Sequence, residues 1–345
     1  MRGSVRDGTV RHEASGALTA GGYLEAMPKG TVERPHLAEI ERAAVLLEAV
    51  LVRTPLVPLH GHERILLKPE IHQPTGSFKV RGVFHAVARM SDEERGRGLS
   101  TVSAGNTAKA LSWAGRHFGV PARSLMPAGA PATKVEAVRA LGGTPVLVPR
   151  EEVFRFLRER GWESEPYAFV HPWIEREVMI GHGTLGLEIA ADCPDLDTVY
   201  VPVGGGGLLG GVGSALRAAR PDVRIVAVEP AGCPALHASV AAGEPREVAC
   251  DTMCDGVAVP YVTSEMYPLL SELADEVVLI SEDEVRAAIR LLALESHVVA
   301  EGSGALAVAA ALKAPAAARG TAVCLVTGGS IDAHVLADVL TAPRG

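Results

Sequence analysis

Residues 68–82 read KPEIHQPTGSFKVRG and place one lysine, Lys79, directly after a short turn. A lysine that is enclosed by a tight turn and by a neighbouring phenylalanine, Phe78, has a lowered pKa, and its neutral amine can attack an aldehyde. The chain holds only six lysines against 27 arginines, so few residues could fill this role. Taken by itself, the segment fits a surface lysine in a turn better than it fits a nucleophile.

Outward from this stretch, short apolar segments alternate with helical patterns, which favours parallel sheets covered by helices. Residues 36–51 have apolar side chains at helical spacing, and the prolines of RTPLVPL (53–59) suit an extended edge segment. Strands are expected at 65–69, 101–105, 123–127, 144–149, 198–203, 224–230, 276–280 and 322–329. Helices are expected between them, at 108–119, 132–143 and 282–296 among other places.

The bulk composition restricts the class of protein. With 345 residues, 48% hydrophobic and 21% charged, the chain can form one large or two medium globular domains. A net charge of −8 argues against a nucleic-acid partner, which would need a basic face. No apolar run approaches ~18 residues and no signal peptide is recognisable, so we expect a soluble cytoplasmic protein without a membrane span. The five scattered cysteines are expected to be small core residues rather than a disulfide or a zinc site.

The segment VPVGGGGLLGGVGSALRAA (201–219) runs from an expected strand into an expected helix. Its glycines let the backbone approach a ligand and turn N–H groups towards an anion, while the helix dipole favours phosphate. A tight turn without a ligand is the simpler interpretation. The spacing Gly205-x-Gly207-x-x-Gly210, with Glu229 at the end of the next strand, also fits an NAD-dependent dehydrogenase.

Two further segments combine a strand with a short polar turn. In TVSAGNTAKALSWAG (101–115), the N–H groups at the helix start could hold a carboxylate, and Asn106 could donate to a phenolate oxygen. A plain helix cap is the alternative there, because Ser and Asn favour that position. In AVCLVTGGSID (322–332), Thr327 follows an apolar strand, which by itself indicates only a buried strand and a Gly-Gly turn.

Taken together, these segments resemble the pyridoxal phosphate (PLP) enzymes of fold type II, the tryptophan synthase beta-like superfamily, in its threonine/serine dehydratase (ammonia-lyase) branch. The resemblance spans about residues 40–340 and implies that Lys79 carries PLP as a Schiff base and moves the proton at the substrate Cα. The residues that it places at the cofactor are Phe78, Lys79, Asn106, Gly204, Gly205, Gly206, Gly207, Leu208, Glu301 and Thr327. Those that it places around the substrate carboxylate are Ser103, Ala104, Gly105, Asn106 and Thr107.

The chain departs from the family pattern at several positions. Thr107 stands where dehydratases usually have His, and Ala104 stands where serine racemases have a second Ser that acts as acid and base. Ala104 therefore favours a lyase over a racemase. Ser330 replaces the usual Asn and receives no role. Glu229 resembles one ligand of a cation site, but Ala235 would occupy the second position, so we expect no metal.

The resemblance implies two three-layer α/β domains with mostly parallel sheets and with the cofactor between them. We expect a tail at 1–34, the large PLP domain at 35–96 and 172–345, and a small substrate-loop domain at 97–171. The implied reaction is elimination of ammonia from a β-hydroxy amino acid such as L-threonine or L-serine, giving a 2-oxo acid. Another β-elimination, β-replacement or threonine-synthase-like step is the nearer alternative, and an NAD-dependent dehydrogenase the remote one. The family is usually dimeric or tetrameric, so we expect a homo-oligomer.

Overall fold

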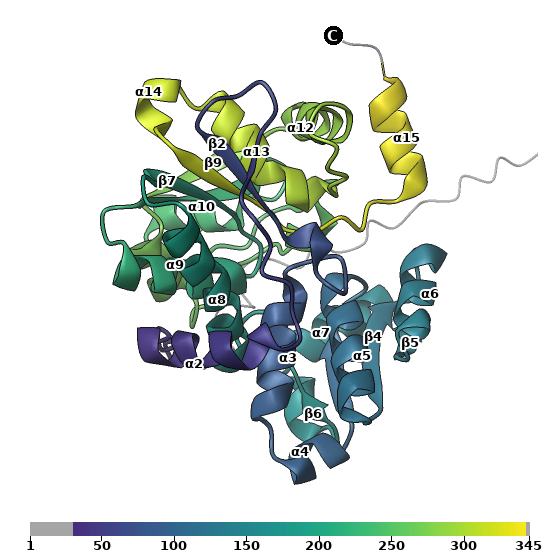
Figure 1. Ribbon diagram of the computed structural model, residues 1–345. Helices are drawn as coiled ribbons and strands as arrows, with labels where there is room; N and C mark the ends of the chain where they lie inside the picture. The colour runs from purple at the N-terminus through teal and green to yellow at the C-terminus, as the bar shows by residue number, and fades with distance from the viewer. Residues whose placement is uncertain (1–29, 343–345) are drawn as a thin grey trace, which may run out of the picture.

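The computed structural model describes residues 30–342, and the expected tail at 1–34 lies almost wholly outside this range. The described chain forms two sheets that lie in separate lobes, the larger sheet above the smaller one in Figure 1. Helices cover both sheets, and helix α3 runs at the junction of the lobes (Figure 1). The expected α/β architecture with mostly parallel sheets is confirmed.

The large sheet has six strands in the order β1-β2-β10-β7-β8-β9. Only the edge strand β1 is antiparallel, which agrees with the proline-rich edge segment expected there. The parallel pairing brings the two ends of the chain together, because β10 lies between β2 and β7. The bounds are β1 Val57–Pro58, β2 Ile65–Pro69, β7 Thr198–Pro202, β8 Arg224–Pro230, β9 Glu276–Ile280 and β10 Ala322–Val326.

Both faces of this sheet are buried, because successive side chains of a strand point to opposite sides. In β10, Ala322, Cys324 and Val326 pack into one core, whereas Val323 and Leu325 pack into the other. The first core is closed by α12 and α13, and the second by α8, α9 and α11. Uninterrupted apolar strands such as AVCLV are therefore explained by burial on both sides.

The small sheet has four parallel strands in the order β5-β4-β3-β6. Helix α5 packs on one face together with α3, whose Val80, Val83 and Phe84 join the same core. Helix α7 packs on the other face against Val102. Helix α3 thus contributes to the small lobe although its first residue, Lys79, follows a strand of the large sheet. The bounds are β3 Leu99–Val102, β4 Ala122–Pro127, β5 Thr144–Val148 and β6 Ala168–Phe169.

Helix α12 begins at a serine that caps its N-terminus. Ser281 accepts a hydrogen bond from the Glu284 N–H, and Glu284 accepts one from the Ser281 N–H, which closes a capping box at α12.

Within residues 30–342, no helix combines the length and the apolar character needed to cross a membrane. The α-helices are α2 Leu37–Glu48, α3 Lys79–Arg89, α4 Asp92–Gly96, α5 Asn106–Phe118, α6 Ala132–Ala140, α7 Arg150–Arg158, α8 Arg176–Asp192, α9 Gly207–Ala219, α10 Ala235–Ala242, α11 Tyr267–Leu273, α12 Glu282–Leu294, α13 Gly302–Lys313, α14 Ala316–Arg319 and α15 Ala333–Thr341. The 3₁₀ turns are η1 Glu70–His72, η2 Gly161–Ser164 and η3 Asp255–Val257.

The expectation that all cysteines are isolated core residues is wrong for one pair. Cys233 and Cys250 form a disulfide. The backbone explains the pairing, because the Asp251 N–H donates to the Gly232 carbonyl over 2.9 Å and so brings the two segments side by side. The other three cysteines, Cys193, Cys254 and Cys324, are buried and free, as expected.

Candidate active site

The turn that precedes Lys79 is fastened to the end of β10. The Phe78 N–H donates to the Thr327 carbonyl at 3.0 Å, and the Gly329 N–H donates to the Gly76 carbonyl at 3.1 Å. Gly76 has a positive φ of 74°, a conformation that favours glycine and lets the chain reverse before the helix. Phe78 and Thr327, which the resemblance assigned to the same cofactor, therefore lie next to each other.

Lys79 is the first residue of α3, and its side chain is half-buried. Its Nζ lies 3.5 Å from the Pro172 carbonyl oxygen and 5.0 Å from the centre of the Phe78 ring. Burial lowers the pKa of Lys79 from 10.5 to about 8, and the negative charge of Glu301 opposes this shift. A substantial fraction of this amine is neutral near neutral pH, as nucleophilic and proton-accepting chemistry requires.

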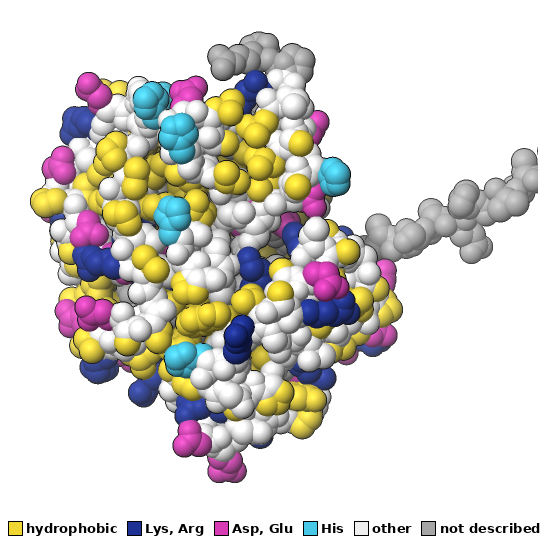
Figure 2. Space-filling model, turned by 45° about the vertical axis from the view of Figure 1, so that its right-hand side comes forward, with side chains coloured by type: hydrophobic (Ala, Val, Ile, Leu, Met, Phe, Trp, Pro, Cys, Tyr) yellow, Lys and Arg dark blue, Asp and Glu magenta, His cyan; other side chains and the backbone are white. Residues whose placement is uncertain are grey.

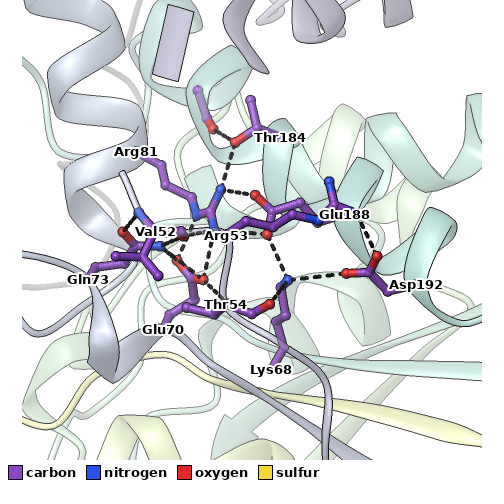
Figure 3. Close-up of polar contacts among 11 residues, drawn as sticks. Val52, Arg53, Thr54, Lys68, Glu70, Gln73, Arg81, Thr184, Glu188 and Asp192 are labelled. Atoms are coloured by element: carbon purple, nitrogen blue, oxygen red, sulfur yellow. Dashed lines mark hydrogen bonds and ion pairs between the residues drawn. The ribbon is translucent and has the colours of Figure 1, made fainter. Parts of the chain in front are cut away.

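Behind Lys79, the start of α3 is held by a buried ionic network (Figure 3). Arg81 pairs with Glu70 of η1 at 2.6 Å and with Glu188 of α8 at 2.7 Å. Lys68 of β2 also pairs with Glu188, at 2.7 Å, and donates to the Thr54 carbonyl. The network joins β2, η1, α3 and α8, so the position of Lys79 is fixed by elements from both halves of the chain.

The SAGN segment turns from β3 into α5. The expected strand at 101–105 ends earlier, since β3 stops at Val102 and Ser103 begins the turn. The Gly105 N–H donates to the Ser103 hydroxyl at 3.1 Å. A Cβ added to Gly105 would meet no atom within 4 Å, so space is open above this turn. The first N–H groups of α5, at Asn106 and Thr107, have no partner within the helix and are available to an anion.

Asn106 and Glu301 connect the two lobes. Asn106 Nδ2 donates to Glu301 Oε1 over 2.8 Å, although the residues are 195 positions apart. Burial raises the pKa of Glu301, while the hydrogen bond from Asn106 and the charges of Lys134 and Lys109 act in the opposite direction. Glu301 immediately precedes α13, but its side chain makes no capping hydrogen bond to that helix. Its carboxylate therefore binds Asn106 across the lobes instead of capping α13.

The glycine loop follows β7 and leads into α9. Gly206 has a positive φ of 92°, and side chains at Gly205 and Gly206 would collide with Trp173 and Leu270. Within residues 30–342, the N–H groups of Gly204, Gly205 and Gly206 find no backbone or side-chain acceptor. Leu208, in the first turn of α9, turns its side chain into the core, so only its N–H could face a ligand.

The segment His171-Pro172-Trp173 lies between the lysine and the glycine loop. Pro172 approaches Lys79, and Trp173 packs on Gly205. His171 is buried, and burial lowers its pKa to about 3, with the charges of Arg160 and Lys79 adding to this shift. In the space-filling view, lysine and arginine side chains lie along the junction between the upper and lower lobes (Figure 2).

Sequence reasoning missed two further lysines at the site. Glu301 interacts electrostatically with Lys79, Lys109 and Lys134, which are three of the six lysines in the chain. Lys109 donates to Ser330 at 2.8 Å, and Lys134 pairs with Asp255 of η3. The scarcity of lysine in this sequence was the one available signal for these positions.

His182 is a buried histidine that packs against the turn before Lys79. It lies inside α8 rather than in a loop, is fully buried, and packs on the Phe78 ring with centroids 4.7 Å apart. Both of its ring nitrogens lack a hydrogen-bond partner among the described residues. His182 therefore supports Phe78, the residue next to Lys79.

Comparison with known proteins identifies the family. A model described as pyridoxal-phosphate dependent enzyme matches residues 47–328, which is most of the chain. This chain belongs to the family of pyridoxal-phosphate dependent enzymes. The PLP enzyme is 37% identical, over 87% of its length and 77% of the relative, to an L-threonine ammonia-lyase from Thermotoga maritima. It is 36% identical, over 78% of its length and 83% of the relative, to the catabolic L-threonine dehydratase TdcB of Escherichia coli K12.

Solved structures agree with the assignment. A threonine deaminase from T.th. superposes with a TM-score of 0.80 and 32% identity, covering 86% of this chain and 99% of that one. Maize serine racemase superposes with a TM-score of 0.82 and 29% identity, covering 89% and 97%. The PLP enzyme thus has the expected fold type II architecture, and the resemblance to the dehydratase branch is confirmed.

The described residues fit PLP. The N–H groups of Gly204 to Gly206, just before α9, have no acceptor among the described residues and could hold a phosphate. Lys79 has the lowered pKa needed to react with the cofactor aldehyde, and Thr327 offers a buried hydroxyl beside the lysine turn. Asn106 would face the phenolic oxygen. The roles of these residues stay predictions, since only the family and the cofactor are established.

The dinucleotide alternative is withdrawn. The matched family is PLP-dependent, and Glu229 is already used, because its carboxylate accepts the N–H groups of Leu236 and His237 at 2.8 Å each. Burial raises the pKa of Glu229 to about 7, against these hydrogen bonds. The Glu229 carboxylate thus binds the first N–H groups of α10, and it is not free to bind a ribose.

Proposed function

We propose that this PLP enzyme is an ammonia-lyase that converts a β-hydroxy amino acid, such as L-threonine or L-serine, to a 2-oxo acid and ammonia. The observation that carries the proposal is the environment of Lys79, which has a pKa of about 8 and interacts electrostatically with Glu301, the hydrogen-bond partner of Asn106. Its Nζ also lies near Pro172, whose neighbour Trp173 packs on Gly205 of the glycine loop. The relatives named as L-threonine ammonia-lyase and dehydratase support the same substrate class.

The roles of the chain's own residues follow from their positions. The substrate carboxylate binds the N–H groups at the start of α5, around Asn106 and Thr107, where the helix dipole favours an anion. Lys79 accepts the proton from Cα, and its partial neutrality at pH 7–8 suits a general base. Bound PLP supplies the electron sink for the pair left at Cα. Phe78 and Trp173 limit the access of water to this space.

Elimination is favoured over racemisation by Ala104. This residue is half-buried in the turn after β3 and has no hydroxyl with which to return a proton from a second face. Ala104→Ser is therefore expected to raise the rate of racemisation of L-serine relative to pyruvate formation. A ratio that does not change in chiral chromatography of the products would remove this argument.

The test of the proposal is the variant Lys79→Ala. We expect it to lose the visible absorbance band of the bound cofactor and more than about 10³-fold of the 2-oxo acid production from L-threonine, because the general base is removed. Lys313→Ala, at a lysine paired with Glu284 away from the site, is the matched control and should keep both properties. Normal turnover of L-threonine and L-serine by Lys79→Ala would rule the proposal out.

A sister reaction on the same cofactor is the second candidate, because Thr107 differs from the usual dehydratase residue. Thr107 is buried at the start of α5, close to the proposed carboxylate site. Incubation with β-substituted amino acids, with and without a nucleophile, separates the two. Formation of a new amino acid in place of a 2-oxo acid would assign β-replacement or a threonine-synthase-like step.

We further propose the domain division at 35–96, 97–171 and 172–345, a cytoplasmic location, and a homo-oligomer. The four strands of the small sheet all lie between Leu99 and Phe169, which supports the middle boundary pair. Light scattering of the purified protein tests the assembly, with a dimer or tetramer expected. A monomer at micromolar concentration would contradict it.

A further inference from the structure

Asn106 takes part in a hydrogen-bond chain that starts at a lysine. Lys109 Nζ lies 2.8 Å from the Ser330 hydroxyl, Ser330 Oγ lies 2.9 Å from Asn106 Oδ1, and Asn106 Nδ2 lies 2.8 Å from Glu301 Oε1. Asn106 and Lys109 are three residues apart on α5 and so share one face of the helix. Ser330 follows β10, more than 220 positions along the sequence.

The chemistry of the end groups gives this chain a direction. A protonated lysine can only donate, so the Ser330 oxygen accepts from Lys109 and its single proton is left for Asn106 Oδ1. At the other end, the Glu301 carboxyl oxygen accepts from Asn106 Nδ2. Turning the amide over would place its oxygen against the oxygen of Glu301 and its N–H₂ group against the Ser330 proton. Two hydrogen bonds therefore hold the amide in one orientation.

An amide nitrogen has two protons, and the chain uses only one of them. The second Nδ2 proton of Asn106 has no acceptor among residues 30–342. The side chains of Asn106, Lys109 and Ser330 are half-buried. Burial lowers the pKa of Lys109, and the negative charge of Glu301 opposes this shift.

We propose that Lys109 and Ser330 are positioning residues that lock the Asn106 amide with its free N–H directed at the PLP ring oxygen. In this proposal both residues act through Asn106. This chain of hydrogen bonds also joins α5 of the small lobe to the segment after β10, which holds the Lys79 turn. The inference rests on the predicted contact between Asn106 and PLP, which is part of the proposed site.

The test titrates apoprotein variants with PLP, followed by the visible absorbance band and by its induced circular dichroism, which reports how the bound cofactor is oriented. We expect Lys109→Met and Ser330→Ala each to weaken PLP binding by about ten-fold and to change the dichroic signal. Lys109→Arg and Ser330→Thr keep a donor and a hydroxyl, so they should stay near the wild type. The double variant should lose no more PLP affinity than either single variant, because both substitutions break the same chain of hydrogen bonds.

Two controls separate the possible failures. Lys313→Met removes a lysine outside the site and should bind PLP as the wild type does. Asn106→Ala tests the premise, since it must weaken PLP binding if Asn106 contacts the cofactor at all. If Asn106→Ala changes binding and dichroism while Lys109→Met and Ser330→Ala do not, the positioning chain is refuted but the proposed site survives. If Asn106→Ala has no effect, the predicted contact and the inference both fail, and the turnover assay of Lys79→Ala still decides the proposed function separately.

Discussion

Arg81 donates two hydrogen bonds to Glu70, 2.6 Å from Nε to Oε2 and 2.9 Å from Nη2 to Oε1, and the exposed fractions of the two side chains are only 2% and 0%. Arg81 lies two residues beyond Lys79 in α3, whereas Glu70 lies in η1, before the lysine turn. Burial of Glu70 disfavours its charged form, and the attraction of Arg81 outweighs this effect and lowers the pKa of Glu70. The lysine is thus placed by a buried ion pair, rather than by the local turn alone.

Removal of Arg81 should destabilise the enzyme strongly. In Arg81→Met, Glu70 would remain buried without its cation, which costs about 3–5 kcal/mol of unfolding free energy. Urea unfolding measures this loss. Arg286→Met, which breaks the exposed pair with Asp338, should cost at most about 1 kcal/mol. The double variant Glu70→Gln/Arg81→Met should recover part of the loss, and equal costs for Arg81→Met and Arg286→Met would contradict the prediction.

The stability of the apoprotein should rise with pH because of Lys79. Its pKa is about 8 when folded and 10.5 in the reference state, so between these values the unfolded chain binds more protons. The stabilising contribution is complete above pH 10.5 and is lost as the pH falls through about 8. Allowing for partial exposure, we expect about 1–2 kcal/mol. Apoprotein of Lys79→Met should lack this rise in denaturant titrations at pH 7.5 and 10, and parallel curves for both proteins would count against it.

His182 should weaken the fold in acid. Burial lowers its pKa well below 6.5, and the charges of Lys79, Arg81 and His85 add to this shift. The unfolded chain therefore takes up a proton below pH 6.5 that the folded protein refuses, so this contribution is lost as the pH falls. We expect His182→Leu to be more stable than the wild type by about 1–2 kcal/mol at pH 5, because two unpaired buried nitrogens are also removed.

Thermal unfolding between pH 5 and 8 measures this difference. The exposed His334 is the control, since His334→Gln should follow the wild-type pH dependence. A wild type and a His182→Leu variant whose stabilities change in step with pH would show that another group is responsible.

The Cys233–Cys250 disulfide should contribute to stability. It closes a loop over a sequence separation of 17, for which about 3 kcal/mol is expected from restriction of the unfolded chain. Thiol titration in denaturant should find three free thiols without reductant and five after treatment with a dithiol. Reduction should lower the urea midpoint of the wild type but not that of Cys233→Ser/Cys250→Ser. Five thiols before reduction would contradict the pairing.

Contiguous patterns could be interpreted without the structure. At 201–219 an apolar strand, a run of glycines and a helical pattern follow one another, so these local elements can be predicted from neighbouring residues. The same holds for the turn before Lys79 and for the SAGN segment, although β3 already ends at Val102 and Gly105 caps α5. Their order along the chain was sufficient to indicate the family, the cofactor and the lysine that would carry it.

The sequence alone therefore indicated the α/β class and the PLP family, and it predicted the segments of the site, because each of these depends on neighbouring residues. Only the tertiary structure decided which distant side chains meet: Lys109 with Ser330, Arg81 with Glu70 and Glu188, Cys233 with Cys250, and His182 with Phe78. The physical reason is that parallel strands need crossover connections, and these bring together residues that no local periodicity relates. Which face of each helix turns inward, and hence which charge finds its partner, depends on the packing of the whole chain.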